Sequence, residues 1–212
     1  MREESLDAAL IYLASQSPRR AKLLRQMGVR FKVVNAAVDE SDQAGESPDQ
    51  YVLRVARAKV EAALAVLSVT ANRTVLAADT AVTLEGHTLG KPRDRADGLA
   101  MLARLSGRTH QVLSGLALWT PGGVRQALST SKVTFRVITP EEAAAYWETG
   151  ESADKAGAYA IQGRGAVFVE RLEGSYSGVV GLPLFETAQL LGAAGITVFG
   201  LRQNREVRRE EQ

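Results

Sequence analysis

The sequence contains no cysteine, and this absence excludes several kinds of chemistry. A disulfide framework, a thiolate nucleophile and a cysteine-ligated zinc or iron–sulfur site all require that side chain. The only histidines are His87 and His110, which makes a histidine-rich metal site or a Ser-His-Asp triad hard to build. Any metal site should therefore use carboxylate oxygens and bind a hard cation.

Long apolar runs are also missing. No uninterrupted apolar stretch is long enough to cross a bilayer, and residues 8–14 are too few and lack the basic flank of a signal peptide. Together with the lack of cysteine, this predicts a cytoplasmic protein without membrane contact. The formal net charge of +2 is too small to attract polyanions in bulk, so basic residues should matter by position.

The familiar catalytic fingerprints are absent as well. The chain has no Walker A loop, no GxGxxG, no HExxH and no GxSxG. The main sequence evidence for four enzyme classes is therefore missing: P-loop enzymes, dinucleotide dehydrogenases, zinc proteases and α/β hydrolases. What remains is a set of lysines and arginines beside isolated carboxylates, a combination that fits metal-assisted chemistry on a phosphorylated small molecule.

The first informative stretch runs from Leu13 to Arg20, where a short apolar strand meets a helix start. Ser17 and Pro18 suit the cap and the first position of a helix, so Arg19 and Arg20 fall in its first turn. Cations there oppose the helix dipole. A phosphate would remove this conflict, although two solvated arginines on an ordinary helix explain the pattern about equally well.

The second informative stretch is Thr74–Val82, whose small and β-branched residues predict a central strand covered on both faces. A carboxylate in such a strand is costly unless it is paired, hydrogen-bonded or bound to a metal. Asp79 is therefore a candidate metal ligand or general base, with a backbone-capping aspartate as the alternative. Further on, Lys91 lies in a rigid Gly-Lys-Pro frame.

Periodicity and turn signals predict an α/β fold with a mixed twisted sheet, flanked by helices in two lobes around a central cleft. We treat residues 1–212 as a single domain whose charged tail, about 202–212, is flexible. The predicted helices begin at Pro18, run over 48–67 and 94–105, begin at a Thr139 capping box, and run over 184–191. The predicted strands cover residues 11–13, 29–34, 74–82, 111–119, 124–138 and 166–171, with Val133, Phe135 and Val137 on a buried face, and residues 175–183 form a loop.

Five blocks in order resemble the signatures of the Maf family: Leu13–Arg20, Ala78-Asp79-Thr80, Gly90-Lys91-Pro92, Asp154–Tyr159 and Gly174–Pro183. The resemblance implies an inosine triphosphate pyrophosphatase-like fold and a nucleoside triphosphate pyrophosphatase that uses Mg or Mn ions. The block from Tyr159 to Gly163 is similar to the branch acting on dTTP and UTP. The family also implies a homodimer.

The resemblance further implies roles for individual residues. Asp79 matches the proposed proton acceptor and, with Glu40, would hold the metal. Specificity positions match Arg19, Thr80 and Gln162. The other matched pocket residues are Ser15, Arg20, Lys59, Lys91, Asp154 and Lys155. An alternative function is a nucleotide-sensing regulator of septum formation with little turnover, although the chain lacks the basic face and aromatic ladder of a nucleic-acid binder.

Overall fold

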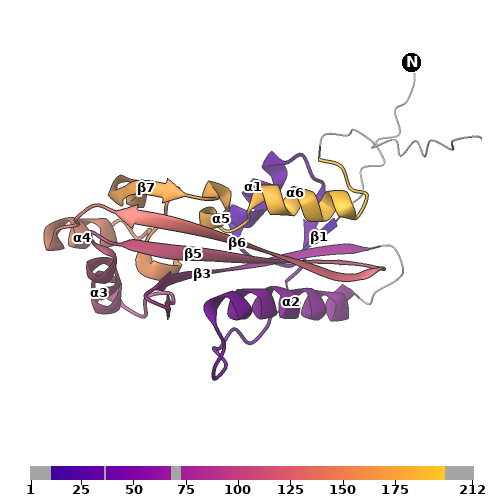
Figure 1. Cartoon of the computed structure of the whole chain (residues 1–212), viewed down its shortest axis with the longest axis horizontal. Helices are drawn as coiled ribbons and strands as arrows, with labels where there is room; N and C mark the ends of the chain where they lie inside the picture. The colour runs from indigo at the N-terminus through magenta and orange to yellow at the C-terminus, as the bar shows by residue number, and fades with distance from the viewer. Residues whose placement is uncertain (1–10, 36, 68–72, 199–212) are drawn as a thin grey trace, which may run out of the picture.

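The computed structural model describes residues 11–35, 37–67 and 73–198, and the predicted C-terminal tail lies outside them. Seven strands form one mixed sheet in the order β2-β1-β3-β5-β6-β7, with β4 added beside β3 (Figure 1). β1 runs parallel to β2 and β3, and the remaining pairs are antiparallel. The predicted mixed α/β sheet with flanking helices is therefore confirmed.

The strands are β1 (Ile11–Leu13), β2 (Phe31–Val33), β3 (Thr74–Leu84), β4 (His87–Leu89), β5 (Thr109–Thr120), β6 (Gly123–Phe135) and β7 (Val169–Glu173). The helices are α1 (Pro18–Gln26), α2 (Pro48–Leu67), α3 (Arg95–Leu105), α4 (Pro140–Trp147), α5 (Tyr176–Val180) and α6 (Leu184–Ala193). Two short 3-10 turns cover Ala156–Ala158 and Arg164–Phe168. Among the described residues, no helix is long and apolar enough to span a membrane.

β3 determines where the sheet leaves a gap, because one of its edges pairs with β1 near its start and with β4 near its end. β1 pairs with β3 as far as Leu76, and β4 begins its pairing at Val82. On the other edge β5 follows β3 throughout residues 75–83. In the described part of the chain, the edge of β3 at residues 77–81 therefore has no strand beside it. Asp79 and Thr80 lie in this gap.

Helix α2 covers one face of the sheet (Figure 1). Its small side chains, Ala56 and Ala63 among them, pack against Val75 and Ala77 of β3. The contact is close enough that a Cβ added at Gly115 of β5 would lie 2.5 Å from the carbonyl oxygen of Val52. A glycine is thus required at this point of β5, and the close packing fixes the distance between α2 and β3.

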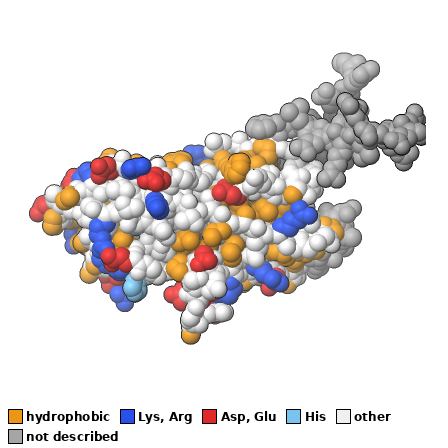
Figure 2. Space-filling view, in the orientation of Figure 1, with side chains coloured by type: hydrophobic (Ala, Val, Ile, Leu, Met, Phe, Trp, Pro, Cys, Tyr) orange, Lys and Arg blue, Asp and Glu red, His pale blue; other side chains and the backbone are white. Residues whose placement is uncertain are grey.

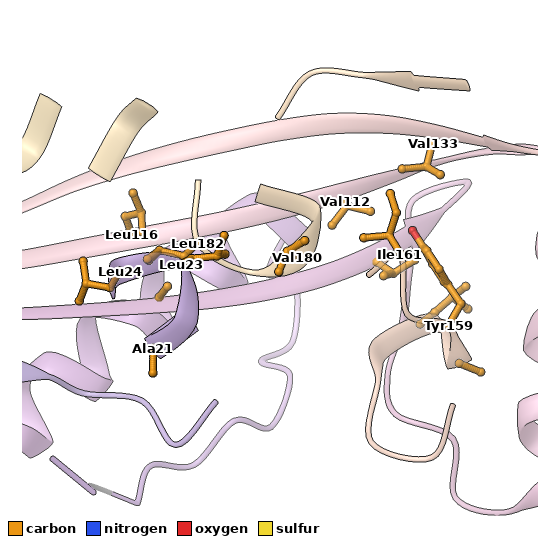
Figure 3. Packing of buried hydrophobic residues seen from close by; sticks show 14 of the residues in the cluster. Ala21, Leu23, Leu24, Val112, Leu116, Val133, Tyr159, Ile161, Val180 and Leu182 are labelled. Carbon is orange, nitrogen blue, oxygen red and sulfur yellow. The ribbon is translucent and has the colours of Figure 1, made fainter. Parts of the chain in front are cut away.

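The opposite face carries the larger hydrophobic cluster. Leu23 and Leu24 of α1 meet Leu116 of β5 and Leu182, as Figure 3 shows. The segment after Gly157 also enters this cluster, since Tyr159 and Ile161 are almost fully buried. Successive residues of β3 point to opposite faces, so Asp79 faces α2 while Thr80 faces α1 and α5.

Several local predictions are confirmed, and others are wrong for identifiable reasons. Helix 48–67 and the Thr139 capping box occur as predicted. The predicted buried position of Val137 is wrong: β6 ends at Phe135, and Val137 is 71% exposed as the chain turns toward Thr139. Residues 164–168 form a 3-10 turn before β7, and the predicted loop contains the five-residue helix α5.

His110 is a buried polar residue in this core. Its side chain is 1% exposed, and Nε2 lies 2.9 Å from the Tyr159 hydroxyl. Nδ1 has no hydrogen-bond partner among the residues that the structure describes. Phe135 and Tyr159 contact the ring edge-on. Burial lowers the pKa of His110 to about 4 from an ordinary value of 6.5. The folded protein therefore resists protonation of His110 where the unfolded chain accepts it.

We expect this difference to make stability depend on pH in a narrow window. Between the two pKa values the unfolded state binds more protons, so the free energy of unfolding should fall by about 2 kcal/mol from pH 7 to pH 5. The hydrogen bond from Arg136 lowers the pKa of Glu142 to about 2. Carboxylates of this kind change the free energy of unfolding only at a pH below this window. Urea unfolding of wild type and His110→Gln at both pH values tests the prediction.

His110→Gln should lose most of this pH dependence, whatever its stability at pH 7. His87→Gln is the matched control because His87 is exposed, and it should behave like wild type. Equal pH dependence in wild type and His110→Gln would show that His110 is not the group that titrates.

Candidate active site

A cleft of about 720 Å³ opens at the gap along β3. It is bordered by the start of α1, the loop before α2, the end of β4 and the segment 154–162. Every residue predicted for the site lines this one cleft: Ser15, Arg19, Arg20, Glu40, Lys59, Asp79, Thr80, Lys91, Asp154, Lys155 and Gln162. The fold thus brings together side chains that are up to 147 positions apart in the sequence (162 − 15).

Arg20 is fixed at the start of α1 by hydrogen bonds from its guanidinium. Nε donates to the carbonyl oxygen of Gly181 at 2.8 Å, while the terminal nitrogens donate to Ser15 Oγ at 3.2 Å and Thr80 Oγ1 at 3.3 Å. Burial lowers the pKa of Arg20, and the charge of Asp79 partly offsets this effect. The guanidinium retains further N–H groups for an anion in the cleft.

The expected hydroxyl cap of α1 is wrong. Ser17 is the N-cap residue, but its side chain makes no capping hydrogen bond. Instead, the Ser17 backbone N–H donates to Ser15 Oγ at 3.2 Å. Ser15 therefore supports both the helix start and Arg20.

Thr80 connects Arg20 to β5 and α5 on the same face of the sheet. Its hydroxyl lies 2.9 Å from Ser114 Oγ, and Ser114 donates to the carbonyl oxygen of Gly178 in α5 at 2.7 Å. Because the Ser114 proton is directed to Gly178, the Thr80 hydroxyl donates to Ser114 and accepts from Arg20. This chain of hydrogen bonds orients Arg20. Nothing in the local sequence distinguishes Ser114, because its role depends on the pairing of β5 with β3.

A second cluster lies on the α2 side of β3. Lys59 Nζ contacts Asp79 Oδ1 at 2.7 Å and Glu40 Oε1 at 2.6 Å. The side chains of Lys59 and Asp79 are 11% and 9% exposed, whereas that of Glu40 is 47% exposed. Partial burial alone would raise the pKa of Glu40, but the hydrogen bond and charge of Lys59 lower it below its ordinary value. Lys59 thus bridges the two carboxylates on this side of β3.

Tyr51 is a cleft residue that sequence reasoning missed. Its hydroxyl donates to the carbonyl oxygen of Glu40 at 3.0 Å and thereby holds the loop before α2. Burial, followed by the nearby charges of Asp79 and Glu40, raises the pKa of Tyr51. Tyr51 and Lys59 are eight positions apart on α2 and share one helix face, a spacing that could have identified the residue.

The rim of the cleft carries the remaining charged residues. Asp154 accepts a hydrogen bond from Lys155 and pairs with Arg19 at 3.6 Å. The bond from Lys155 lowers the pKa of Asp154. Lys91 and Gln162 are exposed beside this pair. The Gly157 backbone N–H donates to the carbonyl oxygen of Gly90 at 3.1 Å, so the segments carrying Lys91 and Asp154 are tied together.

Charge on the outer surface is distributed differently from charge in the cleft. On the face drawn in Figure 2, the lysine and arginine side chains of the described residues are interspersed with aspartate and glutamate. Within the cleft, Arg20 is half-buried and Lys59 is largely buried, and the carboxylates that line the same cleft are Glu40, Asp79 and Asp154. The arrangement suits a small, multiply charged anion that enters between α1 and α2.

Comparisons with known proteins agree with this geometry. Residues 10–194 match the family model described as Maf-like protein. A dTTP/UTP pyrophosphatase of Burkholderia pseudomallei is 56% identical over 88% of this chain and 94% of its own length. One of Saccharophagus degradans is 52% identical over 91% of this chain and 92% of its own length.

A solved structure of the Staphylococcus aureus Ham1 protein covers 59% of this chain and 71% of its own, with a TM-score of 0.43 and 19% identity. That likeness is too slight to carry an argument about the site. The family match extends over the described sheet and over all the residues of the cleft. This chain belongs to the Maf family.

Proposed function

We propose that this protein is a nucleoside triphosphate pyrophosphatase that hydrolyses dTTP and UTP to the nucleoside monophosphate and pyrophosphate. The observation that carries the proposal is the pairing in one cleft of a fixed, half-buried Arg20 with the Asp79–Lys59–Glu40 cluster. The curated relatives named dTTP/UTP pyrophosphatase support the same activity. A binder that performed no chemistry would have no need of a buried carboxylate beside these cations.

In this proposal the cations bind the triphosphate. Arg20 presents its unused N–H groups to the phosphate oxygens, and Arg19 and Lys91 add charge at the rim. Lys59 lies on the opposite wall and holds Asp79 Oδ1 in place. These fixed groups face the charge that develops on the leaving pyrophosphate, so they stabilise the transition state without having to reorganise.

Asp79 is the proposed base. Lys59 contacts Oδ1, so the other carboxylate oxygen of Asp79 is left to orient a water and accept its proton as the water attacks the α-phosphorus. The contact with Lys59 holds the Asp79 carboxylate in a fixed orientation for this transfer. Glu40 shares the contact with Lys59 and reaches the cleft from its own loop.

The same carboxylates fit a divalent cation. Among the described residues, no group of three or more His, Cys, Asp or Glu side chains could hold an ion unaided. Magnesium commonly takes one or two carboxylates and completes its shell with water and substrate phosphates, so Asp79 and Glu40 would bind Mg or Mn together with the nucleotide. A bound ion would neutralise charge on the phosphate oxygens.

Gln162 is the proposed contact to the base. Its amide offers both a donor and an acceptor, which suits the edge of uracil or thymine. Thr80 is committed to Arg20 and Ser114, so its contribution to specificity would be indirect. A homodimer remains a prediction from the family resemblance, and a cytoplasmic location remains a prediction from the composition and the lack of long apolar runs.

Pyrophosphate release with Mg ions across dTTP, UTP, CTP, dATP, GTP and 7-methyl-GTP tests the proposal. We expect release to be largely confined to dTTP and UTP. A preference for 7-methyl-GTP would keep the chemistry but contradict the role of Gln162. No release from any nucleotide by folded protein would contradict the proposed function and favour a regulatory role.

A further inference from the structure

The segment that carries Gln162 is held from behind by two side chains outside the cleft. The backbone N–H of Ala160 donates to the hydroxyl oxygen of Tyr146 at 2.9 Å. The backbone N–H of Arg164 donates to Glu151 Oε2 at 2.8 Å. Tyr146 belongs to α4 and Glu151 to the loop that follows it, and neither residue lines the cleft.

Two glycines allow these acceptors to approach the backbone. A Cβ added at Gly163 would lie 2.3 Å from Glu151 Oε2, and one added at Gly165 would lie 2.7 Å from the Tyr146 hydroxyl oxygen. Gly163 has a φ of −115°, which other residues adopt readily. Gly163 is therefore required for the space that Glu151 occupies and not for its backbone conformation.

Neighbouring residues fix the segment further. Tyr159 is 5% exposed and lies 2.9 Å from His110 Nε2, and Ile161 is 9% exposed within the main cluster. Gln162, by contrast, is exposed and lines the cleft, and it lies between the backbone hydrogen bonds of Ala160 and Arg164. The anchors on both sides leave the backbone of this segment little freedom.

We propose that Tyr146 and Glu151 are positioning residues for nucleobase selection, holding residues 160–164 so that Gln162 meets the base at a fixed angle. This rests on the proposed function, because it concerns selection by the same cleft. The hydrogen bonds from Gln162 discriminate between bases only if its amide is held in place. Neither residue reaches the phosphates or Asp79, so both should affect which base is accepted and leave the bond-breaking step unchanged.

Steady-state kinetics with UTP and CTP, which differ only at the base edge, test the proposal. For Glu151→Ala we expect the kcat/KM for UTP, divided by the kcat/KM for CTP, to fall about tenfold. The fall should come from a higher KM for UTP, while kcat stays within about threefold of wild type. Glu151→Gln retains an acceptor oxygen and should recover part of the ratio. Tyr146→Phe keeps the ring packed and should resemble Glu151→Ala.

Gly163→Ala provides a sharper test. Its added methyl group should displace the Glu151 carboxylate, so the single variant should resemble Glu151→Ala. In the Glu151→Ala background the same methyl group has nothing to displace, and the double variant should be no worse than Glu151→Ala alone. Glu148→Ala is the control, because Glu148 is exposed and pairs with Arg95 away from this segment.

The outcomes separate this inference from the proposed function. An active wild type that prefers UTP, with the ratio unchanged in Glu151→Ala and Tyr146→Phe, would overturn the inference and leave the function standing. Additive effects of Gly163→Ala and Glu151→Ala would also overturn it. A wild type that hydrolyses no nucleotide would overturn both.

Discussion

Replacing Asp79 with asparagine is expected to lower dTTP turnover by about a thousandfold while the protein remains folded. General-base assistance typically contributes about 10²–10⁴ in rate, and an amide cannot accept the proton of the attacking water. Asparagine retains the oxygen that Lys59 contacts, and Lys59 keeps its partner Glu40. Nucleotide binding should therefore persist, since Arg20 and the rim cations are unchanged.

Steady-state kinetics, thermal unfolding and calorimetric nucleotide binding measure these three expectations on one variant. Asp49→Asn is the matched control, because Asp49 is exposed at the start of α2 and does not line the cleft. It should show wild-type turnover. Near-wild-type hydrolysis by Asp79→Asn would remove Asp79 from the mechanism, even if the nucleotide preference were as proposed.

The second large effect is expected at Arg20. Arg20→Lys keeps the positive charge but cannot make the bonds to Gly181, Ser15 and Thr80 simultaneously. A single ammonium also lacks the planar fork that binds phosphate oxygens in pairs. We expect kcat/KM for dTTP to fall about a hundredfold, because one oriented donor group at a developing charge contributes about that much.

Arg25→Lys provides the comparison on the same helix. Arg25 is exposed and its guanidinium lies over the ring of Phe31, 5.4 Å from the centroid, outside the cleft. It should leave kcat/KM unchanged. If Arg20→Lys also stayed within about threefold of wild type, positive charge alone would suffice, and the chain of hydrogen bonds through Thr80 and Ser114 would have no catalytic purpose.

Much of the fold could be predicted because the signals are local. The boundaries of α2 and the capping box at Thr139 follow from residues within one helical turn. α5 was missed because five residues with an internal glycine carry no periodicity. Val137 was placed wrongly because nothing in the alternation of β6 indicates that pairing stops at Phe135.

Some residues of the site could likewise be predicted from the sequence, and others could not. The predicted site residues could be identified from the sequence, most of them in the signature blocks, and the structure places all of these site residues in one cleft. Ser114 and Glu151 could not be identified, since each acts on a backbone or hydroxyl group distant in sequence. The cleft itself arises because β1 ends before β4 begins along β3, a consequence of strand pairing across more than sixty residues (Leu13 with Leu76).

Hydrolysis of dTTP in water enriched in ¹⁸O tests the central claim most directly. Mass spectrometry of both products shows which phosphorus the water attacked. The arrangement of Asp79 opposite the cations predicts one ¹⁸O atom in dTMP and none in pyrophosphate. Label in pyrophosphate, or release of orthophosphate in place of pyrophosphate, would contradict attack at the α-phosphorus and with it the proposed role of this cleft.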